Sequence, residues 1–282
     1  MPVYERGYRG WEDSGTRAAP AWWAIARRGI LEPLKRRGFL FLLVVAWVPA
    51  IVKGGILYFT YKMGEMTKLL GGDWTDITAA GFRSFLEWQT PWVLIILAII
   101  GSGLITKDRE ENGLALYFAR PLGLRDYILG KGLITLFYYF AVTLFPVLAL
   151  CIFGYLSTQG ATGLQMLVAT PLRALVYCTL AGTSFSLVLL ALSSMGTRTV
   201  FVALWWVLLF ATEGLAEIMA MFRPELRILD FAGQHTNMGA LILGGRSMTG
   251  VSPWVSLAVV LGLIAAGLAV LRARVKPVEV VS

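Results

Sequence analysis

The fold is decided by residues 107–131, KDREENGLALYFARPLGLRDYILGK, the one charge-dense segment of an otherwise apolar sequence. Charge-free runs flank this segment at 88–106 and 132–172. At about 1.5 Å of rise per residue and about 20 residues per crossing, the first run crosses a bilayer once and the second crosses it twice. A charged segment between two spans must lie in water. Its excess of Lys and Arg over Asp and Glu predicts the cytoplasmic side.

The composition of the whole chain agrees with a polytopic membrane protein. Of the 282 residues, 57% are hydrophobic and 15% are charged, whereas soluble domains carry about 25% charged residues. The net charge of +8 is explained by basic residues at cytoplasmic flanks, so we expect no nucleic-acid partner. Cys151 and Cys178 both lie in apolar runs and the chain has a single His, so we expect neither a disulfide nor a metal site.

Hydropathy and charge predict an all-α fold with six transmembrane helices and both termini in the cytoplasm. The predicted spans are residues 39–61, 88–106, 132–156, 172–192, 199–221 and 251–271. Of the 25 Lys and Arg residues, 17 fall on segments that this map places in the cytoplasm and 7 on external segments. Tails at 1–19 and 276–282 flank a transmembrane domain at 20–275. Pro49 and Pro146 predict kinks in the first and third spans.

Residues 21–37 predict an amphipathic helix at the membrane interface. Apolar residues recur at spacings of three and four, and Arg27 and Arg28 take the opposite face. The alternative is an ordinary basic flank of the first span. The pair Trp22 and Trp23 favours an interfacial helix, because indole rings prefer the headgroup region.

Three charged residues lie in or near spans. Lys53 either faces a cavity or snorkels to the outer interface. Glu213 and Glu217 share one helical face, so either the fifth span ends near Glu213 or both carboxylates lie on a wet face. We hypothesise that the two carboxylates face a transport pathway or an external vestibule.

Two external loops are predicted, at 62–87 and 223–250. Arg83 and Glu87 are spaced for an ion pair on a short helix before the second span. His235 lies in the second loop, which we expect to be mobile, and residues 241–243 are apolar enough to form a re-entrant piece.

Residues 107–131 also resemble the first cytoplasmic loop of the membrane subunits of type-2 ABC transporters. The resemblance rests on an acidic-basic cluster at 108–111, an apolar run at 114–118, and the residues Gly113, Arg120-Pro121, Arg125, Tyr127 and Gly130-Lys131. Leu114 departs from the pattern, which often has Thr there. Through span count and loop lengths the resemblance extends over roughly residues 20–275.

The resemblance implies a permease subunit that forms the substrate pathway as a dimer, with export as the expected direction, in the inner (plasma) membrane of a bacterium. It further implies separate ATPase subunits that dock on the 107–131 loop and the 21–37 helix. The implied coupling residues are Lys107, Asp108, Arg109, Glu110, Glu111, Arg120 and Arg125.

ATP and Mg²⁺ would be bound by the partner ATPase, because this chain has no P-loop. Residues 123–132 come nearest, with six residues between the glycines instead of four and Gly where Mg²⁺ binding needs Ser or Thr. We therefore expect no cofactor in this chain and no enzymatic activity of its own.

Two roles are open for the acidic start of this loop. Residues 108–111 either begin a short helix that is pressed into the ATPase, or Asp108 merely caps that helix by accepting backbone N–H bonds. Two other classes of function also stay open. One is an ion-coupled secondary transporter or channel that uses Lys53, Glu213 and Glu217, and the other is a membrane scaffold or sensor that transports nothing.

Overall fold

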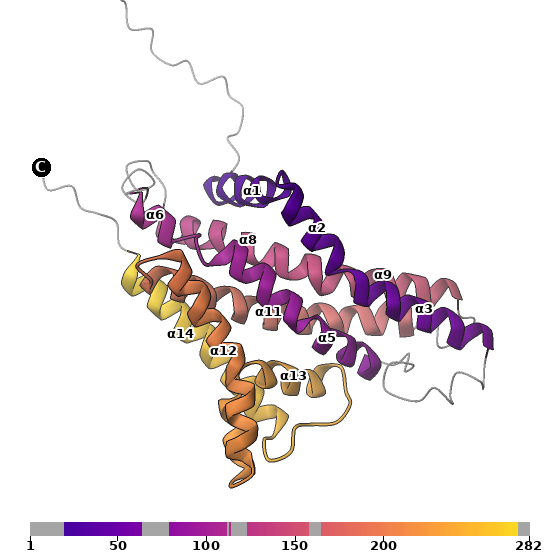
Figure 1. Ribbon diagram of the computed structural model, residues 1–282. Helices are drawn as coiled ribbons and strands as arrows, with labels where there is room; N and C mark the ends of the chain where they lie inside the picture. Colours follow the sequence, from indigo (N-terminus) through magenta and orange to yellow (C-terminus); the bar gives the residue numbers. More distant parts are fainter. Residues whose placement is uncertain (1–19, 64–78, 112, 114–122, 158–164, 276–282) are drawn as a thin grey trace, which may run out of the picture.

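The computed structural model describes residues 20–63, 79–111, 113, 123–157 and 165–275, and among these it contains helices and no strand (Figure 1). Six helical segments are long and apolar enough to cross a membrane, which confirms the prediction of an all-α fold with six spans. These segments are Arg37–Phe59, Ala79–Glu110, Leu124–Leu156, Leu167–Met195, Thr199–Ala220 and Pro253–Arg274.

The helices follow one another with short breaks. In chain order they are α1 (Ala21–Leu34), α2 (Arg37–Val45), α3 (Val48–Met63), α5 (Ala79–Gly101), α6 (Thr106–Glu110), α8 (Leu124–Val142), α9 (Leu144–Ser157), the π-helix η1 (Gln165–Ala169), α11 (Thr170–Met195), α12 (Thr199–Ala220), the 3₁₀-helix η2 (Pro224–Leu229), α13 (Phe231–Ile242) and α14 (Pro253–Arg274). The helix predicted at 21–37 therefore ends at Leu34, and Arg37 already begins α2.

Both predicted kinks are present, and both have the same cause. The first span is broken after Val45, four residues before Pro49, and the third after Val142, four residues before Pro146. Proline lacks the N–H that would bond to the carbonyl four residues earlier, and its ring collides with that carbonyl. At Pro49 and Pro146 the preceding helix therefore ends at that residue and a new helix starts two or three residues later.

Two spans are longer than the apolar runs predicted. The second helix begins at Ala79 instead of residue 88, and the third begins at Leu124 instead of residue 132. Arg83 and Glu87 form the predicted ion pair, at 3.0 Å, but they do so within α5 itself. An apolar run marks the part of a helix that suits hydrocarbon, and the helix continues into water wherever its backbone stays bonded.

The fifth span is a single helix, because α12 continues through Glu213 and Glu217 to Ala220. The prediction of a mobile loop at 223–250 is wrong. This segment contains η2 and α13, and His235 on α13 is only 1% exposed. Asp230 caps α13 by accepting a bond from the Gly233 N–H at 2.7 Å. The helix was missed because its polar residues suggested a loop.

The centre of the molecule is α11, which packs on α5, α8, α9, α12, α13 and α14 (Figure 1). In the most apolar part of its span 61% of residues are buried, against 22% in the first, fifth and sixth spans. Those three spans therefore lie at the periphery. Phe185 of α11 holds an aromatic cluster together with Trp206, Phe210 and Phe231.

Candidate functional site

The candidate site is the end of the bundle that carries α6. This five-residue helix follows α5 after a short break, and its N-terminus is satisfied by a residue from another helix. Ser193 Oγ of α11 accepts bonds from the N–H groups of Ile105, at 3.0 Å, and Thr106, at 3.2 Å. Thr106 Oγ1 donates back to the Ser193 carbonyl at 2.8 Å. Because the first N–H groups of a helix have no partner inside it, this exchange fixes α6 to α11.

Asp108 fixes the same helix to α8. Its Oδ2 accepts a bond from the Tyr127 hydroxyl at 2.6 Å and pairs with Lys131 Nζ at 2.8 Å. Lys131 also donates to the Leu104 carbonyl at 2.9 Å. Capping by Asp108, one of the two roles left open, is therefore wrong: Ile105 is the N-cap, and the Ser193 side chain accepts the first N–H groups. Asp108 is used for tertiary bonding.

The remaining charged residues of α6 and its C-cap, Glu111, are exposed. Lys107, Glu110 and Glu111 are exposed, as is Arg125 at the start of α8. Arg109 is exposed too, and its guanidinium donates to the carbonyl of Ser194 on α11. Arg120 lies outside the described residues. The described part of the predicted coupling set thus divides into two residues that bond α6 to the bundle, Asp108 and Arg109, and an exposed charged surface of Lys107, Glu110, Glu111 and Arg125.

The helix α1 lies against α8 at this same end (Figure 1). The two backbones approach closely at Gly130, where an added Cβ would come within 2.9 Å of the Trp22 carbonyl oxygen and 2.8 Å of Ile25 Cβ. Further along, the Tyr138 hydroxyl donates to the Ile30 carbonyl at 2.6 Å. Thus α1 is attached to the bundle by close packing and by a buried hydrogen bond.

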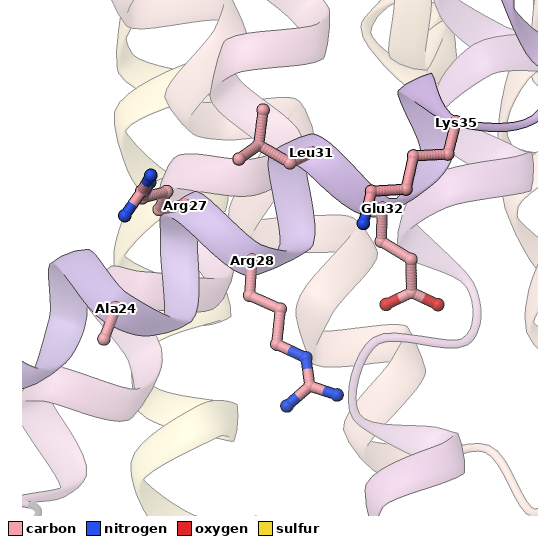
Figure 2. A pocket seen from close by; sticks show the side chains of 6 residues that line it. All are labelled: Ala24, Arg27, Arg28, Leu31, Glu32 and Lys35. Atoms are coloured by element: carbon pink, nitrogen blue, oxygen red, sulfur yellow. The ribbon is translucent and has the colours of Figure 1, made fainter.

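The outer surface of α1 carries the other residues predicted for it. Trp22 is partly buried and Trp23 is 46% exposed. Arg27 and Arg28 are both exposed and leave the helix in different directions (Figure 2). A pocket of about 470 Å³ lies along this face, lined by Ala24, Arg27, Arg28, Leu31, Glu32 and Lys35.

The three charges predicted for a pathway are not brought together. Lys53 lies on α3, which packs on α9 and α5, and its side chain has no exposed surface. Its side chain therefore lies inside the protein, and the choice between a cavity and the outer interface stays open. Glu213 and Glu217 lie exposed on α12, and Glu217 pairs with Arg227 of η2 at 3.0 Å. An exposed pair of this kind adds little stability, but it does hold η2 near α12.

Sequence reasoning missed a buried polar network between α13 and α14. Ser256 donates to Gln234 Oε1 at 2.7 Å and accepts from Asn237 Nδ2 at 2.8 Å, while Asn237 Oδ1 accepts the Met248 N–H at 2.7 Å. The spacing of Gln234 and Asn237 by three was the available signal, because it puts both amides on one helical face.

His235 belongs to the same helix and contacts α11. Its Nδ1 lies 2.8 Å from the Phe231 carbonyl and its Nε2 lies 3.0 Å from Ser184 Oγ. Burial lowers the pKa of His235 to about 4, so the ring is neutral at pH 7. A carbonyl only accepts, so Nδ1 carries the proton and Ser184 donates to Nε2. The residue therefore joins α13 to α11 through its bond with Ser184.

Taken together, the fold and this site define a multi-pass helical membrane protein with a short charged helix fixed to the end of its bundle. No protein-family model matches the chain, and no curated protein matches it.

Proposed function

We propose that this chain is the permease subunit of a type-2 ABC transporter, which pairs with a second copy and is driven by separate ATPase subunits. The proposal rests on the resemblance of residues 107–131, and one structural observation carries it further. The charged helix α6 presents Lys107, Glu110 and Glu111 to solvent while Asp108 and Thr106 fix it to α8 and α11.

This arrangement suits the transmission of force. A partner that moves α6 also moves α5, α8 and α11, because the connections are short and buried. Exposed charges contribute little free energy each, so an interface made of them engages and releases readily in water. The helix α1 adds a second contact surface, since it is packed on α8 as well.

The orientation follows from the same assignment. The α6 end, α1 and both chain termini would lie in the cytoplasm of a bacterium, and α13 would lie at the outer end. The residues Ile105 and Tyr127 pack with Leu271 and Val275, so the end of α14 lies at the α6 end too. ATP and Mg²⁺ would be held by the partner, and the expected direction of transport is export.

The test reverses two exposed charges, in Glu110→Lys with Glu111→Lys, and leaves the Asp108 tether in place. We expect the variant to fold, to lose copurification with its ATPase, and to transport less substrate per ATP hydrolysed. Glu225→Lys, an exposed reversal on η2, is the matched control and should behave as the wild type. Unchanged copurification and unchanged transport per ATP would remove α6 from the coupling role and shift it to Arg27 and Arg28 of α1.

One observation favours the ion-coupled alternative, namely the buried position of Lys53 inside the first span. Buried charges in membrane spans often belong to ion pathways. Purified protein in liposomes separates the two functions. Transport that needs a proton or sodium gradient and proceeds without any ATPase would replace the permease proposal.

A further inference from the structure

A groove of about 1160 Å³ separates α1 from α5 and α6, and α8 forms its floor. One wall consists of α1 and the start of α2, with Arg28, Glu32, Arg36 and Phe39. The other wall consists of the end of α5 and of α6. On the floor, Lys131 and Ile134 line the groove. It is distinct from the smaller pocket shown in Figure 2, although Ala24, Arg28 and Glu32 line both.

The lining changes from apolar to charged along the spans. Phe39, Ile99 and Ile100 line the part that lies within the first and second spans. Lys107 and Glu111 line the part beyond the last apolar turn. The charge-free run 88–106 of the second span has about the 20 residues that cross a bilayer, and it ends directly before Lys107. The groove therefore crosses the boundary between hydrocarbon and headgroups.

The charges that line the groove leave an excess of cations at the headgroup level. Asp108 pairs with Lys131 at 2.8 Å, and Glu32 lies 3.9 Å from Arg36. In the part of the chain that the structure describes, Arg28 and Lys107 form no ion pair. Glu111 is the one remaining acid of the lining. The lining thus leaves two cations, the Arg28 guanidinium on one wall and the Lys107 ammonium on the other, against one carboxylate, that of Glu111.

We infer that this groove binds an anionic phospholipid of the leaflet at the α6 end, with its phosphate between Arg28 and Lys107. Its acyl chains lie against Phe39 and Ile99, in the part of the groove that is level with hydrocarbon. Arginine and lysine are the side chains that bind phosphate oxygens best, and the apolar part of the groove excludes a soluble anion of the same charge. The inference needs only the membrane position of the six spans and is independent of any ATPase.

Native mass spectrometry of the full chain, released from nanodiscs of phosphatidylglycerol and phosphatidylcholine, tests the inference. We expect the wild type to retain phosphatidylglycerol preferentially. Each Lys or Arg near an anionic headgroup strengthens the attraction about fivefold, so Arg28→Ala with Lys107→Ala should lower that retention about tenfold or more. The control Arg27→Ala with Lys35→Ala removes the same charge from residues that do not line the groove, and it should change retention less than about twofold.

Two further variants separate the groove from a general attraction of basic protein to acidic lipid. Arg28→Lys with Lys107→Arg keeps both charges and should retain the lipid. Ile99→Trp fills the apolar part of the groove without any change of charge, so lipid retention should fall. The substitution leaves the core intact, because Ile99 is 55% exposed. Three results would overturn the inference. They are an equal loss of phosphatidylglycerol retention in both alanine pairs, a loss confined to the control pair, and retention that Ile99→Trp does not change. If a partner helix occupies the groove instead, neither the wild type nor any variant will retain lipid.

Discussion

At the residue scale, neighbouring acids of one charged run have different roles. Asp108 is bonded to Tyr127 and Lys131, whereas Glu110 and Glu111 two and three residues later are exposed. For Glu110 the difference follows from helical geometry, since side chains two residues apart point to nearly opposite sides of a helix, whereas Glu111 is the C-cap, where the backbone leaves the helical conformation. Stability and partner binding can therefore be changed independently within four residues.

Replacement of Asp108 by Asn should destabilise the protein without touching the exposed charges. The change leaves the Lys131 ammonium, whose side chain is 8% exposed, without its carboxylate. Loss of one partner of a fully buried ion pair costs about 3–5 kcal/mol, and the cost is lower here because the Asp108 side chain is 18% exposed. Thermal unfolding in detergent should show a clear fall in melting temperature for Asp108→Asn, while Glu110→Gln should stay within about 0.5 kcal/mol of the wild type. Equal melting temperatures would mean that the tether adds no stability.

At the element scale, the position of α1 depends on small residues. Gly130 of α8 and Gly29 of α1 each lie where an added Cβ would meet a neighbouring atom, Ile25 Cβ at 2.8 Å and Ile134 Cδ1 respectively. Close approach of two helices at glycine is a common way to pack helices in membranes, where van der Waals contact contributes much of the association energy. The contact at Gly130 also includes backbone, and backbone cannot move aside as a side chain can.

Gly130→Val should therefore release α1 from α8. Overpacking of a tight contact costs about 1–3 kcal/mol, which corresponds to a roughly 5- to 150-fold larger population of detached α1. Trypsin cleavage after Lys35 and Arg36, in the exposed junction between α1 and α2, measures that population. Gly38→Val is the matched control, since a Cβ there meets nothing within 4 Å and the variant should be cut at the wild-type rate. Equal cleavage of both variants would show that α1 has another anchor.

At the scale of the whole molecule, the bundle has two different ends. One end carries α6, α1 and the end of α14, and the other carries η2 with its Arg227–Glu217 pair and the capping residue Asp230. Burial raises the pKa of Asp230, with the nearby Glu217 adding to the effect, although the bond from Gly233 opposes it. The excess of Lys and Arg on the α6 side of the sequence predicts which end faces the cytoplasm.

Thiol labelling in intact cells measures this orientation directly. We expect Glu225→Cys, exposed on η2, to react with a membrane-impermeant maleimide, and Glu111→Cys to react only after the cells are opened. The native Cys151 and Cys178 are buried and should give no background. Rapid labelling of Glu111→Cys in sealed cells would reverse the orientation and with it the proposed position of the ATPase.

Part of this fold and site was predictable from local sequence. The six spans follow from apolar runs, and the two kinks follow from Pro49 and Pro146, since each effect acts within about four residues of its cause. The helix limits at Ala79 and Leu124 were not predictable from hydropathy, because those helices continue past the membrane boundary. Of the candidate site, the docking role of the charged segment stays a prediction, and the bonds of Asp108 to Tyr127 and Lys131 were not foreseen, because they join residues 19 and 23 positions apart.

What the sequence determined by itself is the number of spans and the location of the charged segment between the second and third. A long apolar run in a bilayer must form its backbone hydrogen bonds within itself, and a charged run must stay in water. Both features can therefore be predicted without knowing which distant residues they contact. Only the tertiary structure decided that Thr106 meets Ser193, which lies 87 residues away, and that His235 meets Ser184, which lies 51 residues away. Such bonds depend on which helices pack together, and packing is decided by the shapes of whole faces, which short-range sequence patterns do not encode.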